Sequence, residues 1–429
     1  MTDKNLAQAA LNKATRRLAP FMCLLFLLSF IDRANVSFAA LAMNKDLGFT
    51  PTVYAWGVGF FFFGYVLFEV PSNMVLERIG ARRWIAPLVI AWGLASMLLA
   101  FARGADSFFA LRFLLGAAEA GLLPGLLLYT TYWFPAESRG RLTAWIMLAI
   151  PLSIVIGGPI SGLILSLPGL DGAGGLKNWQ WMFVLEGLPA LFAGLAVYRL
   201  LPDRPGAASW LSPDEAHALS ELVATENTGA VAEHARLTEG LFSLPTLLLS
   251  FAYFGALLGG FGIIFWTPQI VKGFGLSNVE TGFVAAIPYA FAVAAMIVLG
   301  RIGDRSGKRI ALVAGPLLVG ALGLVVAGAS SDLRLSIVAL TLAACGIYGM
   351  LPSFWTLPPT YLTGSARAAA FAIVNSIGAL GGFVGPYVIA WVKEMRGEFG
   401  LGLMVLGAGA ACSAALVLLL ARLRPAPTR

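Results

Sequence analysis

Charged residues are scarce in this chain: they make up 12% of its 429 residues, whereas hydrophobic residues make up 59%. Soluble globular domains carry about twice that share of charge. The composition therefore excludes a soluble globular protein. The strict alternation of polar and apolar residues that is typical of a membrane β-barrel is also missing. A helical membrane protein remains.

Histidine and cysteine are almost absent. The two histidines, His217 and His234, both lie in a central polar stretch, and the three cysteines, Cys23, Cys345 and Cys412, lie in apolar segments. A disulfide framework, a cysteine-based metal site and a histidine proton relay within the membrane are therefore not expected. No nucleophile with an adjacent base, phosphate-binding loop or metal-ligand spacing is recognisable, so we expect neither an enzyme nor a metal site.

Long hydrophobic segments recur along the whole chain, each long enough to cross a hydrocarbon core of about 30 Å as a helix. They predict an all-α membrane protein with twelve transmembrane helices, at residues 19–43, 54–77, 84–102, 108–134, 141–166, 180–201, 242–271, 279–300, 310–330, 335–362, 368–392 and 399–421.

The basic residues account for the net charge of +7 without nucleic acid as a partner. With an even number of spans, both termini lie on one side of the membrane, and most lysines and arginines flank the spans on that side. The positive-inside rule places this side in the cytoplasm. We therefore expect both termini and the central polar stretch to be cytoplasmic.

The polar stretch at residues 202–241 separates two halves, residues 1–201 and 242–429, with six spans each. Within it, the motif SPDE at residues 212–215 predicts the start of a short helix. Short sequences recur in the two halves at one constant spacing. The matched pairs are Glu77 and Asp304, Arg78 and Arg305, Gly80 and Gly307, Arg82 and Arg309, and the Gly-Pro pairs at 158–159 and 385–386. Such repeats predict two six-helix bundles related by a pseudo-twofold axis, with the substrate between them near the middle of the membrane.

In the first half, Asp32, Arg33, Arg112 and Glu119 lie within or near membrane depth. An ionisable group at membrane depth costs at least a few kcal/mol unless it is paired or faces a cavity. Arg112 and Glu119 are two helical turns apart, which predicts that they face the same cavity. Arginine suits a carboxylate ligand, and a buried glutamate suits a proton carrier. The alternative is a purely structural cluster of ion pairs. Asp32 is either a second proton site or the partner that holds an arginine in place.

Two of the matched sequences form a motif that resembles the signature loop of the major facilitator superfamily, Gly-x-x-x-Asp-Arg-x-Gly-x-Arg/Lys. The copy from Gly300 to Arg309 fits it fully, whereas the first copy has Asn73 and Glu77 in place of Gly and Asp. We expect the two loops to form a cytoplasmic salt-bridge latch that breaks as the halves move; simple anchoring by positive charge is the alternative. The predicted gating residues are Glu77, Arg78, Gly80, Arg82, Gly300, Asp304, Arg305, Gly307 and Arg309.

Five longer motifs narrow the resemblance to the anion:cation symporter family, which includes carriers for tartrate, phthalate, hydroxyphenylacetate, hexonates and hexuronates. They are FIDRANVSFAALAMNKDLG, FFFGYVLFEVPSNMVLERIGARRW, RFLLGAAEAGLLPGLLLYTTYWFP, GGPISG and WQWMFVLEGLPA. The tartrate-carrier-like branch looks nearest. The resemblance implies that Arg33, Tyr65, Arg112, Trp355 and Asn375 bind the substrate and that Asp32 and Glu119 serve proton coupling. Phe30 and Ile150 replace polar residues of the sugar-acid carriers, so we expect a less polar cavity. Glu69 and Glu186, each near a proline, are interpreted as structural.

These features predict a proton-coupled transporter that imports a small organic carboxylate, either a tartrate-like hydroxy acid or an aromatic acid, by alternating access. We expect no cofactor other than the coupling proton, and a monomer embedded in the lipid of a bacterial inner membrane. An exchanger or exporter of organic anions is the first alternative. A membrane sensor that signals through its central polar stretch is a remote one.

Overall fold

The computed structural model describes residues 3–227, 243–361 and 365–423. All regular structure in these ranges is helical, and twelve helical segments are long and apolar enough to cross a membrane. The prediction of an all-α protein with twelve membrane-spanning helices is therefore confirmed. The first half contains α1 (Asp3–Leu47), α2 (Pro51–Ile79), α3 (Ala81–Leu98), α4 (Ala105–Glu119), α5 (Leu122–Trp133), α6 (Ala136–Ile164) and α7 (Asn178–Leu200). The second half contains α10 (Leu244–Lys272), α11 (Asn278–Ser306), α12 (Arg309–Ala329), α13 (Leu333–Gly349), α14 (Leu351–Phe354), α15 (Pro358–Tyr361), α16 (Ser365–Arg396) and α17 (Gly400–Leu420).

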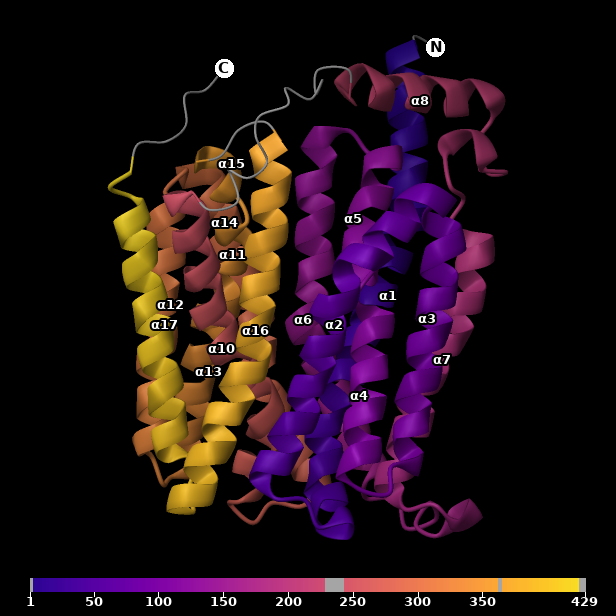
Figure 1. The fold of residues 1–429 in the computed structure, drawn as a ribbon. Helices are drawn as coiled ribbons and strands as arrows, with labels where there is room; N and C mark the ends of the chain where they lie inside the picture. Colours follow the sequence, from indigo (N-terminus) through magenta and orange to yellow (C-terminus); the bar gives the residue numbers. More distant parts are fainter. Residues whose placement is uncertain (1–2, 228–242, 362–364, 424–429) are drawn as a thin grey trace.

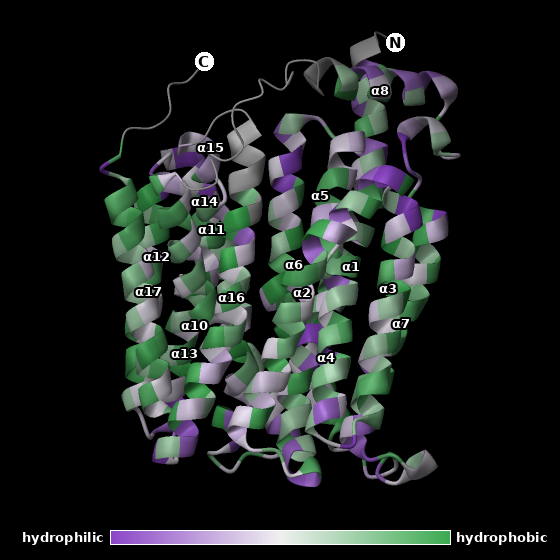
Figure 2. Ribbon diagram, viewed as in Figure 1, coloured by the Kyte–Doolittle hydropathy of each residue, from purple (hydrophilic) through white to green (hydrophobic). Residues whose placement is uncertain are grey.

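The helices stand roughly parallel, with α1 to α7 on one side of the molecule and α10 to α17 on the other (Figure 1). Helix α8 (Pro213–Asn227) lies across one end, where α1 begins and α17 ends. We call this end the termini face and the other end the opposite face. Hydrophobic residues cover the middle of the helices, and hydrophilic residues gather towards both ends (Figure 2). The exact limits of the two predicted halves stay a prediction, and residues 228–241 of the predicted polar connection lie outside the described residues.

Helix α1 starts at Asp3, well before the predicted start of the first span at residue 19. Its extension packs against α8 through an ion pair of 2.6 Å between Lys13 Nζ and Glu215 Oε1. Helix α8 begins as the SPDE motif predicts: Ser212 Oγ accepts a hydrogen bond from the backbone N–H of Glu215, and Glu215 Oε2 accepts one from the backbone N–H of Ser212. The bonds from Lys13 and from the Ser212 backbone lower the pKa of Glu215 below the usual range of a glutamate.

The fourth predicted span is broken into α4 and α5 between Glu119 and Leu122, which the sequence analysis did not anticipate. Pro124 explains the break. It has no N–H to donate to the carbonyl of Ala120, and its ring crowds that carbonyl. The tenth span breaks in the same way between α13 and α14, where Pro352 follows Tyr348 by four residues. Glu119 thereby becomes the last residue of a helix.

The two halves meet mainly through the helix pairs α2 with α16 and α6 with α11, and α1 also contacts α10. At the α6–α11 contact the backbones almost touch, since a Cβ atom added to Gly158 would lie 2.9 Å from the carbonyl oxygen of Gly282. At the α2–α16 contact, a Cβ atom added to Gly59 would lie 2.0 Å from the ring of Phe383. Both sites lie nearer the opposite face, because α2 and α11 begin there while α6 and α16 end there. The glycines let the halves close at that end.

Candidate functional site

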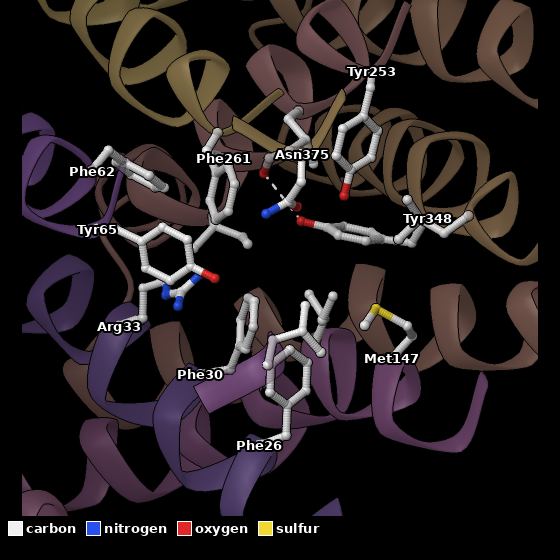
Figure 3. A pocket seen from close by; sticks show the side chains of 17 residues that line it. Phe26, Phe30, Arg33, Phe62, Tyr65, Met147, Tyr253, Phe261, Tyr348 and Asn375 are labelled. Atoms are coloured by element: carbon white, nitrogen blue, oxygen red, sulfur yellow. Dashed lines mark hydrogen bonds between the residues drawn. The ribbon is translucent and has the colours of Figure 1, made fainter. Parts of the chain in front are cut away.

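A cavity lies between the two halves (Figure 3). Its wall is mostly aromatic and aliphatic, and Arg33 is the one charged side chain among the described residues that line it. The lining residues are Phe26, Phe30, Arg33, Phe62, Tyr65, Leu123, Met147, Ile150, Tyr253, Leu257, Gly260, Phe261, Ile264, Tyr348, Leu351, Asn375 and Ala379. An apolar pocket with a few polar groups is the usual form of a small-molecule site.

Arg33 is fixed from two directions. Its Nη2 and Nε lie 2.8 and 3.3 Å from Glu119 Oε2, so one carboxylate oxygen receives two charge-assisted hydrogen bonds. Its guanidinium carbon lies 4.4, 4.7 and 5.3 Å from the ring centroids of Phe30, Phe61 and Tyr65. Cation–π contacts of this kind strengthen where water is excluded. Arg33 is therefore a held cation in the cavity wall.

Glu119 lies behind Arg33, at the end of α4, and is 1% exposed. Its Oε1 atom is buried without a hydrogen-bond partner among the described residues. Arg33 is the only described residue that forms an ion pair with it at 4.0 Å or less. The negative charge of Glu119 thus depends on Arg33, which is the group that faces the cavity.

Arg112 does not line the cavity, which differs from the expectation that both arginines face it. It is fully buried behind Phe61, with its guanidinium carbon 5.0 Å from that ring, and its Nε donates to the carbonyl oxygen of Gly57 at 3.4 Å. Its Nη1 and Nη2 have no partner among the described residues. The reason is the close packing of α2 on α4: a Cβ atom added to Gly116 would lie 1.9 Å from the carbonyl oxygen of Phe61. Phe61 therefore separates the two arginines.

Asp32 points away from Arg33. Its carboxylate accepts hydrogen bonds from Trp92 Nε1 at 3.1 Å and from Ser96 Oγ at 2.8 Å, both on α3. Consecutive residues of a helix point about 100° apart, so Asp32 and Arg33 reach different neighbours. Of the two roles left open by the sequence, pairing with an arginine is not seen among the described residues.

Tyr65 and Asn375 line the cavity, as the resemblance implied, whereas Trp355 lies outside the lining. The Trp355 ring packs at 5.0 Å against Tyr253, which itself faces the cavity, so Trp355 supports the wall from behind. Figure 3 shows Asn375 near the centre of the wall. Its Nδ2 donates to Glu69 Oε1 at 2.7 Å. Glu69, interpreted from the sequence as structural, therefore joins the two halves. Its position one helical turn after Tyr65 is the sequence feature that could have placed it near the cavity.

The gating residues lie at the termini face, where no described ion pair joins the two loops. Glu77, Arg78, Asp304 and Arg305 are exposed. The other two basic gating residues, Arg82 and Arg309, form hydrogen bonds that do not cross to the opposite half. Arg82 donates from its backbone to Asp203 Oδ1 at 3.1 Å and from its side chain to the carbonyl oxygen of Tyr198, and Arg309 donates to the carbonyl oxygen of Thr356 at 3.1 Å.

Glycine residues allow the chain to turn in both of these loops. Gly80 joins α2 to α3 with φ of +92°, and Gly307 joins α11 to α12 with φ of +64°. Side chains other than glycine rarely adopt such angles. Gly300 lies instead within α11. The latch itself stays a prediction.

Comparison with known proteins identifies the fold. The family description "Major Facilitator Superfamily" matches residues 22–386 of the chain. A partially occluded, inward-open structure of the xylose transporter XylE from E. coli aligns with a TM-score of 0.74 at 14% identity, over 97% of this chain and 99% of that one. At that identity the likeness shows the fold alone.

Three relatives are similar over nearly the whole chain. A protein of Agrobacterium vitis named "Putative tartrate transporter" is 45% identical over 425 residues, which is 99% of this chain and 94% of the relative. A "Quinolone resistance transporter" of Acinetobacter baumannii is 39% identical over 91% of this chain and 90% of its own length. The "Inner membrane transport protein RhmT" of Escherichia coli is 35% identical over 96% and 95%. The resemblance predicted from the motifs is confirmed: the chain is a multi-pass membrane protein of the Major Facilitator Superfamily, in its anion:cation symporter branch.

Proposed function

We propose that this chain is a proton-coupled secondary transporter that imports a small organic carboxylate by alternating access. The observation that carries the proposal is Arg33, the one cation in the described wall of a largely apolar, aromatic-rich cavity, held by a buried glutamate behind it. A planar guanidinium matches a carboxylate in a bidentate manner and stays charged at all relevant pH values. The kinship with the relative named "Putative tartrate transporter" supports the same substrate class.

Coupling of substrate binding to proton uptake follows because the substrate carboxylate and Glu119 both bind Arg33. A substrate carboxylate that binds Arg33 competes with Glu119, whose only described ion-pair partner is that arginine. A buried carboxylate that loses its cation is favoured in its neutral form. Binding of the anion and uptake of a proton by Glu119 therefore support each other. Asp32, held by Trp92 and Ser96 rather than by a cation, is the second candidate proton site.

The rest of the wall fits a short hydroxy acid or an aromatic acid. Tyr65 and Asn375 offer hydrogen bonds to substrate hydroxyl groups, while Phe26, Phe30 and Phe261 offer an apolar surface. Arg112 takes the role of a buried positive charge near Glu119 rather than that of a direct ligand. We further propose a monomer in a bacterial inner membrane with both termini in the cytoplasm, which agrees with the positive-inside distribution and with the name of the RhmT relative.

Purified carrier in proteoliposomes tests this function. Uptake of radiolabelled tartrate is expected to rise with an inward proton gradient and to collapse when a protonophore is added. Equal uptake with and without the gradient would exclude proton coupling. Arg33→Ala should abolish uptake, while Arg103→Ala, at an exposed arginine, serves as the matched control.

Substitution of Glu119 separates binding from coupling. Glu119→Gln should keep tartrate exchange between the two sides, because a neutral amide mimics the protonated acid, but lose accumulation driven by the proton gradient. Accumulation at the native level in Glu119→Gln would refute the coupling role of Glu119. Asp32→Asn, measured in the same assay, tests the second candidate site.

The second candidate function is organic-anion exchange or export. It is favoured by the kinship with a quinolone resistance transporter at 39% identity. The same vesicles distinguish the two functions when substrate and proton gradients are opposed. If an inward proton gradient drives efflux of the substrate, the carrier is an antiporter and not an importer.

A further inference from the structure

Glu69 is bound by the other half of the molecule. Its Oε1 accepts a hydrogen bond from Asn375 Nδ2 at 2.7 Å, and its Oε2 accepts one from Ser376 Oγ at 3.4 Å. Glu69 lies on α2 and both donors lie on α16. Glu69 is only 7% exposed, and no described cation forms an ion pair with it. A buried carboxylate needs hydrogen-bond donors, and those of Glu69 come from across the interface between the halves.

Several side-chain contacts join α2 to α16, and the contact of Glu69 with Asn375 lies at one end of this row of contacts. The two helices are antiparallel neighbours that touch at Trp56 with Tyr387, at Trp56 with Phe383 and at Glu69 with Asn375. Helix α2 ends at the termini face. Among the described hydrogen bonds and ring contacts between α2 and α16, those of Glu69 therefore lie nearest to that face. The contacts between aromatic side chains lie nearer the opposite face.

Asn375 also belongs to the cavity wall, and Tyr65 lies one helical turn before Glu69 on α2, about 6 Å closer to the opposite face. The amide that ties the two halves together is thus the same amide that a bound molecule meets. Glu69 lies on the side of Asn375 and Tyr65 that is nearer the termini face.

We propose that Glu69 and Asn375 form a gate on the termini side of the cavity, and that this gate selects hydroxylated acids. A hydroxyl group is both a donor and an acceptor. Inserted between the two side chains, it accepts from Asn375 Nδ2 and donates to Glu69 Oε1, so both keep a partner while the direct bond between the halves breaks. An unhydroxylated carboxylate accepts from Asn375 but repels Glu69 and leaves Glu69 Oε1 without its donor. The identity of the substrate class rests on the proposed function, whereas the gate itself does not.

The gate can be tested without any substrate. Asn375→Asp places two carboxylates against each other, so the halves should separate on the termini side at pH 8 and less so at pH 5. The double variant Glu69→Gln with Asn375→Asp restores a donor and an acceptor in exchanged positions and should close the gate again. Spin labels at Met74 on α2 and Ile302 on α11, which are 54% and 43% exposed, report the separation in a background without the native cysteines.

We expect the distance between the two labels to be longer in Asn375→Asp than in the protein with native Glu69 and Asn375. In the double variant, the distance should equal the native one. Distances in Asn375→Asp that match the native ones at pH 8, or a double variant that stays as open as the single one, would overturn the gate. If Asn375→Asp does not fold, Glu69→Ala is measured in its place. It also removes the hydrogen bond between the halves, but it does not bring two negative charges together.

Selectivity is tested by competition in proteoliposomes with tartrate, which carries two hydroxyl groups, and succinate, which has the same carbon skeleton and none. The native carrier should prefer tartrate, and Glu69→Ala should lower that preference by about tenfold, as expected for one hydrogen bond. Glu398→Ala, at an exposed acid, is the matched control. An unchanged preference in Glu69→Ala would refute hydroxyl selection. If the native carrier moves neither acid, the proposed function fails while the label distances still decide the gate.

Discussion

Removal of Arg33 gives the most direct test of the site energetics. In Arg33→Ala, Glu119 Oε2 loses both of its hydrogen bonds, and Oε1 has no described partner to begin with. Loss of one member of a buried ion pair costs about 3–5 kcal/mol, because the remaining charge stays desolvated. The three aromatic rings around the guanidinium also lose a neighbour. We therefore expect Arg33→Ala to lower the free energy of unfolding by about 3–5 kcal/mol at pH 8.

The loss should depend on the charge of Glu119. Proton uptake by Glu119 removes the uncompensated charge, so the destabilisation should be smaller at pH 5 than at pH 8. The double variant Arg33→Ala with Glu119→Gln carries no buried charge at this position and should recover most of the lost stability. The cycle of native, two single and one double variant then isolates the interaction between the two side chains.

Denaturant unfolding in detergent, followed by tryptophan fluorescence, measures these differences. The matched control is the ion pair of Lys177 with Asp46, whose side chains are 56% and 26% exposed. Lys177→Ala should cost less than about 1 kcal/mol, as exposed pairs do. A loss below about 1 kcal/mol in Arg33→Ala, or a double variant no more stable than Arg33→Ala, would show that Glu119 does not depend on Arg33 for its charge.

Two further predictions concern the contacts between elements. Gly282→Ala would place a Cβ atom 2.4 Å from the carbonyl oxygen of Gly158, so it should hold the opposite face open and slow transport at least tenfold; Gly315→Ala, where nothing lies within 4 Å, should transport as the native chain does. Because the pKa of Glu215 is lowered, chiefly by Lys13, the docking of α8 should be complete at neutral pH and be lost as the pH falls through that lowered value. Lys13→Ala should raise the midpoint of the Glu215 titration in carbon-13 NMR spectra and speed hydrogen exchange in α8 at pH 7; unchanged values would contradict the pairing.

Much of the fold follows from the sequence because the membrane restricts the choices. Within a hydrocarbon core every backbone polar group must be satisfied inside its own segment, so an apolar run of sufficient length predicts a helix. The start of α8 was also predictable, since its capping residues are adjacent in the chain. The break at Glu119 was missed, although Pro124 marked it, because the apolar run continues without interruption through both pieces.

The amino-acid sequence is enough to identify the charged residues at membrane depth and, through the motifs around them, the family. Asp32, Arg33, Arg112 and Glu119 stand out because any ionisable residue in an apolar span is costly. The partners of these four residues, in contrast, are known only from the packing of the helices in the structure. Helical spacing gives the direction of a side chain within its own helix, whereas a partner depends on how separate helices pack. That packing pairs Arg33 with Glu119 and buries Arg112 behind Phe61. It also joins Glu69 to Asn375, two residues from opposite halves that no local pattern connects.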